Sequence, residues 1–449
     1  MRRESDDATV MLREAVRSSL EAHVPHGARL ALGFSGGRDS VVLLDALATV
    51  APSRGHTIAA IHVHHGLSAN ADAWARFCVE RCEELGVACV VRRVDVAHQP
   101  RTSLEALARR ARYVALTEAA REIGAPVVAL AHHRNDQAET LLLQLLRGAG
   151  PHGLAAMPAL REDATGATWW RPLLAVARAR IDAYARDCGL AFIDDESNAD
   201  ARHARNAVRQ SVLPALSGIA PQADATLARA AAHQAEAARL LDELAEQDAS
   251  AAFDGATLLR ESLDLLAPHR ARNLLRWYLR GQGLPAPSSA RLAAMLDQLR
   301  GARGDSAIRL AHAGVEIGVH QGRIALHAAL PLRFDVPWCG EPALVLPHGT
   351  LVFGRADGAG VDEKRLTCAP VRVRARMGGE RFQVAPDRPR RALKSILRDA
   401  GIPAWERNGL PLIFCGDALV AVAGVGIDAA FRTLPAQPGV TISWHPKGI

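Results

Sequence analysis

Residues 29–45 read RLALGFSGGRDSVVLLD, and this stretch decides the fold. The apolar run from Leu30 to Phe34 predicts a strand, the two adjacent glycines predict a turn, and the run from Val41 to Leu47 predicts a helix. Adjacent glycines let backbone N–H groups converge on an anion, and the start of a helix adds unpaired N–H groups and the positive end of its dipole. A glycine turn capped by serine or aspartate is the alternative. Because Ser-Gly-Gly-x-Asp-Ser stands directly between strand and helix, we favour a phosphate-binding loop at residues 35–40.

The cations of the chain are almost all arginine. Lysine occurs three times, at positions 364, 394 and 447, and arginine supplies the remaining 51 of the 54 cations. Because no lysine precedes residue 364, no Walker A lysine serves the glycine loop, and the phosphate site must be of another kind. A carboxylate beside a polyphosphate usually acts through a divalent cation, so Asp39 is the candidate ligand for Mg²⁺.

Strand and helix patterns alternate over the first part of the chain. Strand-like runs cover residues 58–63, 87–96 and 126–131. Helical patterns follow them over residues 68–85, 102–123 and 135–147. This alternation predicts an α/β fold with a Rossmann-like parallel sheet, in which ligands collect at the carboxyl ends of the strands. The glycine loop, His64-His65 and His132-His133 all follow strands, so we expect them at one edge of the sheet.

The remainder of the chain predicts further domains. After a first domain at residues 1–215, residues 216–330 carry helical patterns and predict a helical domain. Residues 331–365 predict a linker with short strands, and residues 366–449 predict a small α+β domain.

Composition limits the class of protein. No apolar run of the 449 residues reaches the roughly 18 needed to span a membrane, and the first residues carry no apolar signal segment. The seven cysteines form no CxxC pair, which argues against a zinc ribbon or a disulfide framework and predicts a reduced, cytoplasmic protein without a membrane partner. The sequence leaves the oligomeric state open, with a homodimer as the alternative to a monomer.

A basic segment lies near the C-terminus. Residues 371–400 hold nine cations and three anions, a local excess equal to the +6 net charge of the whole chain. Such a segment predicts a polyanionic partner, nucleic acid above all, with a solvated charged face as the alternative.

The stretch AHHRNDQAET at residues 131–140 carries the strongest acid–base pattern. His132, Asp136 and Glu139 stand at i, i+4 and i+7 and would share one helix face. A charged helix start is one alternative, and a metal site with one histidine and two carboxylates is another. We favour substrate positioning and proton handling.

Other histidines and arginines leave alternatives open. His62, His64 and His65 could ligate a metal, but we favour His64 as a residue that shapes a loop beside the nucleotide. Arg112 could contact phosphate or RNA, with an exposed helix face as the alternative. Arginines at 202, 205 and 209 form an i, i+3, i+7 stripe for which a solvated face and an RNA-facing surface are equally open.

Taken together, these motifs resemble a known family. SGGRDS matches the PP-loop of the N-type ATP pyrophosphatases, and HVHHGLS, EALARRARY, AHHRNDQAET, LLRGAGPHGLAAM, RPLL and DESNAD look like tRNA(Ile)-lysidine synthetase. The resemblance resumes in the last eighty or so residues, at RARMGGERF and LKSILRDAGIPAWERNGLPLIFCGDALVAVAG, which are similar to the distal C-terminal domain of that family.

The resemblance implies a reaction. Such enzymes use ATP to adenylate the C2 oxygen of the wobble cytidine in a tRNA(Ile) with a CAU anticodon, and they release diphosphate. The ε-amino group of free L-lysine then displaces AMP and gives lysidine, which changes both decoding and charging from methionine to isoleucine.

Carried over position by position, the resemblance implies a set of site residues. The ATP phosphates would be bound by Ser35, Gly36, Gly37, Arg38, Asp39 and Ser40, with Asp39 serving Mg²⁺. The adenylation, lysine and cytidine sites would be formed by Asp39, Arg112, His132, Asp136, Glu139 and Arg205. Lysine has a pKa near ~10.4 and must lose a proton before it attacks, so its cation needs a carboxylate and a base nearby. Many family members carry Asp-Asp where this chain has Asn135-Asp136, so we assign Asn135 no metal or base role.

Two other classes of function remain as alternatives. A tRNA sulfur-transfer enzyme with a PP-loop would need a thiol pair or an iron–sulfur cluster, and Cys78 and Cys82 instead form a CxxxC within a predicted helix. A non-catalytic RNA-binding protein is the other alternative, and the intact glycine loop and the acidic cluster Asp194-Asp195-Glu196 argue against it.

Overall fold

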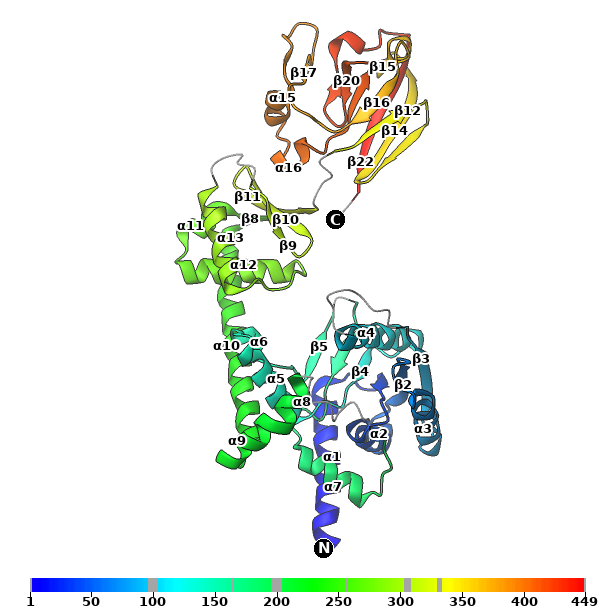
Figure 1. The fold of residues 1–449 in the computed structure, drawn as a ribbon, viewed down its shortest axis with the longest axis vertical. Helices are drawn as coiled ribbons and strands as arrows, with labels where there is room; N and C mark the ends of the chain where they lie inside the picture. Colours follow the sequence, from blue (N-terminus) through cyan, green and yellow to red (C-terminus); the bar gives the residue numbers. More distant parts are fainter. Residues whose placement is uncertain are drawn as a thin grey trace. The chain divides into compact units, whose positions relative to one another are not determined.

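A six-stranded sheet organises the first of two units, Met1–Leu241 and Asp242–Ile449, into which the computed structural model divides the chain (Figure 1). The structure describes residues 2–95, 104–163, 165–194, 204–255, 257–302, 308–328 and 333–447. The sheet has the order β3-β2-β1-β4-β6-β5, and all neighbours run parallel except β5 and β6. Its strands are β1 (Arg29–Gly33), β2 (Thr57–His64), β3 (Ala88–Arg93), β4 (Val127–Ala129), β5 (Leu160–Glu162) and β6 (Thr168–Trp170).

Helices connect these strands as the alternating pattern predicts. They are α1 (Arg2–His23), α2 (Arg38–Val50), α3 (Ala71–Glu84), α4 (Leu104–Glu122), α5 (Arg134–Leu146), α6 (Pro151–Leu154), α7 (Arg178–Asp187), α8 (Ala204–Ala207), α9 (Leu213–Ile219) and α10 (Ala223–Ala252). A short 3₁₀ turn, η1 (Pro52–Arg54), follows α2, and a π-helical turn, η3 (Val208–Val212), joins α8 to α9. The α/β class with a largely parallel sheet is therefore confirmed.

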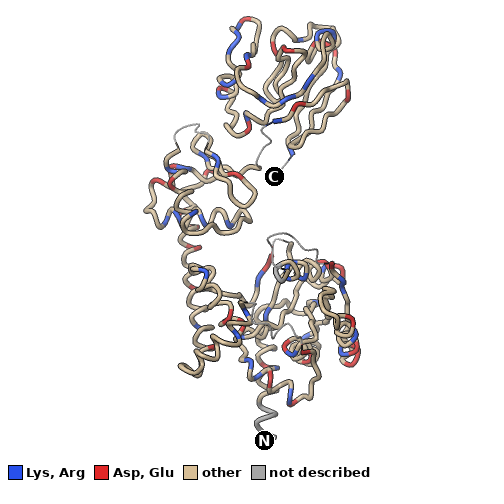
Figure 2. The backbone as a smooth tube through the Cα atoms, viewed as in Figure 1, with Lys and Arg blue, Asp and Glu red and all other residues tan. Residues whose placement is uncertain are grey.

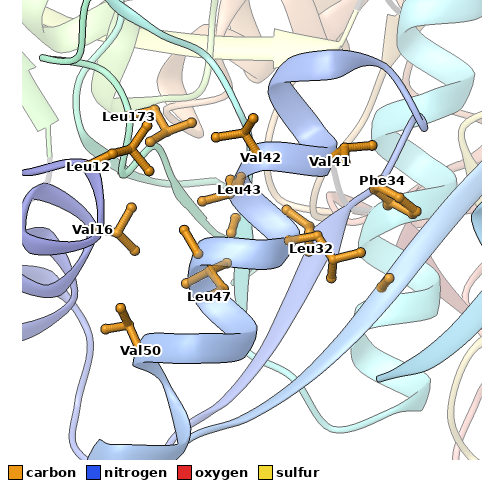
Figure 3. Packing of buried hydrophobic residues seen from close by; sticks show 14 of the residues in the cluster. Leu12, Val16, Leu32, Phe34, Val41, Val42, Leu43, Leu47, Val50 and Leu173 are labelled. Atoms are coloured by element: carbon orange, nitrogen blue, oxygen red, sulfur yellow. The ribbon is translucent and has the colours of Figure 1, made fainter. Parts of the chain in front are cut away.

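Side chains of β1 alternate between the two faces of the sheet. Leu30 and Leu32 pack with residues of α1, α2 and α7, whereas Ala31 packs with residues of α4 on the other face. Figure 3 shows the first of these clusters, where Val16 of α1 and Leu47 of α2 meet the sheet. Both faces are thus buried, which explains why β1 reads as an unbroken apolar run.

The strand order reverses at β1. Strand β2 lies on one side of β1 and β4 on the other, so the loops after β1 and β4 leave the same edge of the sheet in different directions. This is the switch point at which open parallel sheets form their ligand crevice. The fold therefore brings residues 34–37 and 130–133 together, as expected from the sequence.

The first part of the second unit combines helices with a sheet. An antiparallel sheet of order β7-β8-β11-β10-β9 shares one core with three helices, so strands accompany the helices that the sequence predicts for this stretch. These elements are β7 (Phe253–Asp254), β8 (Thr257–Leu259), α11 (Arg260–Leu265), α12 (Pro268–Gly281), α13 (Ser289–Gly301), β9 (Leu310–His312), β10 (Val315–His320) and β11 (Arg323–Ala328).

Two sheets, β12-β16-β19-β20-β21 and β13-β14-β22-β15, enclose a common core in the last part of the chain. Their strands are β12 (Asp335–Trp338), β13 (Ala343–Leu346), β14 (Gly349–Asp357), β15 (Val361–Asp362), β16 (Val371–Arg374), β19 (Leu412–Cys415), β20 (Ala418–Val422), β21 (Gly426–Ile427) and β22 (Pro438–Pro446). The other elements are α14 (Glu363–Leu366), β17 (Arg381–Phe382), β18 (Arg391–Ala392), α15 (Leu393–Asp399), α16 (Ala404–Arg407) and η4 (Ala429–Phe431).

The stretch expected to be a linker, residues 331–365, takes part in this double sheet over the residues that are described. Strand β12 pairs with β16, and β14 pairs with β22 over nine residue pairs. Hydrogen bonding thus joins these strands to the final segment, a pairing that short strand-like pieces do not reveal locally. Within the described ranges, no helix is long and apolar enough to cross a membrane.

Candidate active site

The glycine loop is held at the edge of the sheet by backbone contacts from distant segments. Phe34 N–H donates to the carbonyl of Ile61 (2.9 Å), and Ile193 N–H donates to the carbonyl of Gly36 (2.9 Å). Gly36 has a φ of +79°, and a Cβ there would overlap Ile193 Cδ1 and lie 3.0 Å from Cys78 Sγ. Only glycine meets both the backbone and the space requirement at this position.

The serines of the loop hold its turn together. Ser40 Oγ donates to the carbonyl of Gly37 (2.8 Å) and lies 3.1 Å from Ser35 Oγ. Gly37 immediately precedes α2 and has no side chain that could cap the helix. The first N–H groups of α2 therefore meet no side-chain acceptor from that position. This is the arrangement in which a helix start binds phosphate.

Arg38, which was expected among the phosphate ligands, is paired elsewhere in the structure. Its NH1 donates to Asp182 Oδ1 of α7 (2.7 Å), and its guanidinium lies over the ring of Phe192, 4.6 Å from the centroid. The guanidinium of Arg38 is therefore engaged by Asp182 and Phe192.

Asp39 lies in the first turn of α2 and faces two cationic groups at long range. Its Oδ2 is 3.6 Å from His133 Nε2 and 3.8 Å from Arg178 NH1, and its Oδ1 is buried without a hydrogen-bond partner among the described residues. An unpartnered carboxylate oxygen beside a phosphate loop fits a Mg²⁺ ligand, because Mg²⁺ is usually held by one or two carboxylates together with phosphate oxygens. No group of three His, Cys, Asp or Glu residues within the described ranges forms a protein-only metal cage.

His133 and Asp136 build the start of α5. Asn135 N–H donates to His133 Nδ1 (3.2 Å), and His133 N–H donates to Asp136 Oδ2 (2.9 Å), which forms a reciprocal cap. Burial alone would lower the pKa of His133, but Asp39 and Asp136 outweigh it and raise that pKa above its usual value. Burial likewise opposes ionisation of Asp136, yet His133 and His132 hold the pKa of its carboxyl below the ordinary range.

Glu139 is completely buried and bound by two arginines. Arg209 Nε and NH2 lie 2.6 and 3.0 Å from its two oxygens, and Arg205 Nε lies 3.0 Å from Oε2. Arg205 NH2 also donates to Thr140 Oγ1 (2.7 Å), and Arg209 NH2 reaches Asp136 Oδ1 at 3.3 Å. Arg205 and Arg209 of the predicted stripe thus turn toward α5, and both oxygens of Glu139 are occupied, whereas Arg202 lies outside the described residues.

His132 is a neutral imidazole in this setting. Burial is the main cause that lowers its pKa to about 4, with Arg171, Arg109 and Arg205 adding to the effect and Asp136 opposing it. Its Nδ1 is buried without a hydrogen-bond partner among the described residues. At neutral pH this nitrogen can accept or donate one hydrogen bond, according to tautomer, toward a bound ligand.

Arg112 lies apart from this acidic cluster. Its Nε donates to His65 Nε2 (3.2 Å) at the end of β2, and burial followed by the charge of Arg112 lowers the pKa of His65 to about 4. His62 Nδ1 contacts the carbonyl of Phe34 and Cys78 Sγ, so this histidine ties β2 to the glycine loop. His64 Nε2 lies 3.2 Å from Asp72 Oδ1, so each of the three histidines has at least one nitrogen in contact with another residue of the protein.

The structure brings together Asp39, His132, Asp136, Glu139 and Arg205 near the switch point. It adds residues that the sequence did not assign to the site: His133, Arg178, Asp182 and Arg209. Arg209 follows Arg205 by one helical turn in the predicted arginine stripe. This spacing was the signal in the sequence that both side chains could face the same site. Nothing local marks Asp182 as a partner of Arg38, because 144 positions separate them.

The basic segment near the C-terminus is partly neutralised by acids from outside it. Arg372 pairs with Asp335 (2.7 Å) and Arg390 with Asp428 (2.9 Å), whose side chain is fully buried. Figure 2 shows both cationic and acidic positions in this last part of the chain. Arg388 and Lys394 are exposed and form no ion pair among the described residues, so both are candidates in this segment for contact with a polyanion.

Three protein families match the chain. A PP-loop domain matches residues 11–216, a TilS substrate binding domain matches residues 258–325, and a TilS substrate C-terminal domain matches residues 371–444. The tRNA(Ile)-lysidine synthase of Nitrosomonas europaea is 43% identical over 96% of this chain and 95% of its own length. That of Burkholderia pseudomallei is 41% identical over 94% of each. Among solved structures, a U34-tRNA thiolase from Methanococcus maripaludis matches 51% of this chain and 80% of its own at 16% identity, with a TM-score of 0.45.

Proposed function

The chain belongs to the tRNA(Ile)-lysidine synthase family, and we propose that its phosphate loop adenylates the tRNA before lysine is added. The protein is an ATP-dependent ligase that forms lysidine on tRNA(Ile), with ATP as a substrate of its PP-loop domain. The proposal concerns the route of this reaction and the residues that carry it.

In the proposed first step, the C2 oxygen of the wobble cytidine attacks the α-phosphorus of ATP. The bond from the α-phosphorus to the bridging oxygen breaks, and its electron pair leaves with diphosphate. The single observation that carries this proposal is the unpartnered Oδ1 of Asp39 in the first turn behind the glycine loop. Asp39 would hold Mg²⁺, which neutralises phosphate charge when bound.

In the proposed second step, the ε-amino nitrogen of lysine attacks C2 and AMP leaves. The ammonium group must first lose a proton, so it needs an anion to bind it and a neutral acceptor nearby. Asp136 is the better anion, because its pKa is depressed and it keeps its charge, and because its contact with Arg209 (3.3 Å) is longer than the contacts of Glu139 with Arg205 and Arg209 (3.0 and 2.6 Å). His132 is a neutral hydrogen-bond acceptor for that ammonium group, and Glu139 holds Arg205 and Arg209 beside Asp136.

Incubation with ATP, labelled L-lysine and a tRNA(Ile) with a CAU anticodon, followed by nucleoside analysis, tests the function directly. Labelled lysidine is expected only when all three substrates are present. Exchange of labelled diphosphate into ATP that requires tRNA but not lysine would separate the adenylation step. Lysidine formation without any such exchange, or thiolated nucleoside instead of lysidine, would contradict the proposed route. A homodimer and a cytoplasmic location stay predictions, which sedimentation and cell fractionation test.

A further inference from the structure

The phosphate loop needs a cation that its own sequence does not supply. ATP brings its negative charge mainly on the β- and γ-phosphates, and diphosphate gains charge as it leaves. The first 363 residues contain no lysine, and Arg38 is bound to Asp182 and Phe192. Arg205 and Arg209 are bound to Glu139 at 2.6–3.0 Å.

Arg178 is fixed at the edge of this loop by its backbone. It is the first residue of α7, and its N–H donates to Asn135 Oδ1 (3.2 Å) at the start of α5. Arg134 N–H donates to the carbonyl of Val176 (3.0 Å), two residues earlier. Two hydrogen bonds therefore tie the start of α7 to the start of α5.

The side chain of Arg178 makes only long contacts, and its two partners are carboxylates. Its Nε lies 3.4 Å from Asp182 Oδ1, and its NH1 lies 3.8 Å from Asp39 Oδ2, within ion-pair distance but beyond hydrogen-bond length. About a third of the side chain is exposed (32%), so a ligand can reach it. The oxygen of Asp182 that meets Arg178 also accepts the bond from Arg38.

We propose that Arg178 binds the β- and γ-phosphates of ATP and neutralises the departing diphosphate, in place of the lysine that serves other phosphate loops. Asp182 is the positioning residue: it holds Arg38 away from the loop and directs Arg178 toward Asp39. An arginine suits this task because its planar guanidinium bonds two phosphate oxygens at once. The inference rests on the proposed adenylation, since diphosphate leaves only in that step.

Direct binding of ATP and of AMP to the full-length protein tests this assignment without relying on turnover. Loss of a charge-assisted contact costs about 1.5–3 kcal/mol, so Arg178→Ala should weaken ATP binding roughly 10- to 100-fold. AMP has no β- or γ-phosphate, so its affinity should not change. Arg178→Gln, which keeps a polar side chain without the charge, should behave like Arg178→Ala, and Arg178→Lys should restore part of the ATP affinity.

Arg180 provides the matched control, because it lies on the same helix two positions away. Arg180→Ala removes the same charge and should leave both affinities unchanged. If Asp182 acts through Arg178, Asp182→Asn should weaken ATP binding in the wild-type background and add no further loss to Arg178→Ala.

Three outcomes would overturn the assignment in distinguishable ways. Equal ATP affinity of Arg178→Ala and wild type would remove Arg178 from the phosphate site and leave the proposed function standing. Equal loss of ATP and AMP affinity in both neutral variants would make the residue structural. Failure of the wild-type protein to bind ATP at all would refute the proposed function together with this inference.

Discussion

The Glu139 cluster offers a prediction whose magnitude follows from its burial. The side chain of Glu139 is 1% exposed, whereas those of Arg205 and Arg209 are 27% and 33% exposed. Removal of one partner from a buried ion pair costs about 3–5 kcal/mol, because the remaining charge stays buried. Arg209→Ala leaves a fully buried carboxylate with Arg205 alone and should cost about 3 kcal/mol. Glu139→Gln leaves arginines that water can reach and should cost less, about 2 kcal/mol.

The free energies of unfolding of the two single variants and the double variant measure this directly. Because the groups share one network, the double variant should be destabilised by at least about 1 kcal/mol less than the sum of the single effects. Urea unfolding provides the values, and Arg134→Ala, which breaks the part-exposed ion pair with Asp224, is the control, with an expected cost of at most about 1 kcal/mol.

The same variants decide whether Glu139 binds lysine. If Glu139 only anchors the two arginines, Glu139→Gln should lower kcat and stability while the KM for lysine changes little. A Glu139→Gln protein as stable as wild type, with a KM for lysine raised tenfold or more, would refute the anchoring role. It would support the expectation from the family resemblance that this carboxylate meets the substrate cation.

Four further substitutions test the glycine loop, Asp39, His132 and the basic segment near the C-terminus. Asp39→Asn should abolish diphosphate exchange and leave tRNA binding, measured by filter retention, within about twofold; equal loss of both would contradict the Mg²⁺ role. Gly36→Ala should abolish ATP binding, whereas Gly27→Ala, also at positive φ but with open space around it, should cost only about 1–2 kcal/mol of stability. Because the folded pKa of His132 is about 4, the unfolded chain gains the proton first as pH falls below 6.5; stability should drop by about 2 kcal/mol between pH 7 and 5, and His132→Gln should remove that part of the slope in urea unfolding. Arg388→Gln should lower the slope of log affinity for tRNA against log salt by about 1, and an unchanged slope would place the RNA elsewhere.

Local patterns were sufficient to predict the centre of the first unit. The apolar run, the glycine pair and the following helix lie within seventeen residues, and each depends on backbone preferences of adjacent positions. The expected phosphate loop and α5 therefore appear at the expected residues. The parallel sheet followed in the same way, because alternation of strands and helices leaves few ways to bury both faces.

Pairings between distant segments could not be predicted from such patterns. Glu139 and Arg209 are 70 positions apart, and nothing in either local sequence selects the other. For the same reason, the count of charges in residues 371–400 could not include the acids from outside that segment that pair with its arginines. Arg390 pairs there with the fully buried Asp428, so neutralising it would test the stability of the domain rather than contact with tRNA.

The lengths of the ion pairs separate the supporting residues of the site from those that can bind a ligand. Arg38 and Glu139 are held in contacts of 2.6–3.0 Å, which a ligand would have to break at a cost. Asp39 meets His133 and Arg178 only at 3.6 and 3.8 Å, so Mg²⁺ or phosphate can replace these contacts with shorter bonds and lose little. Tightly paired arginines therefore shape the crevice, and the loosely paired Asp39 and Arg178 are the groups whose charges remain available to ATP.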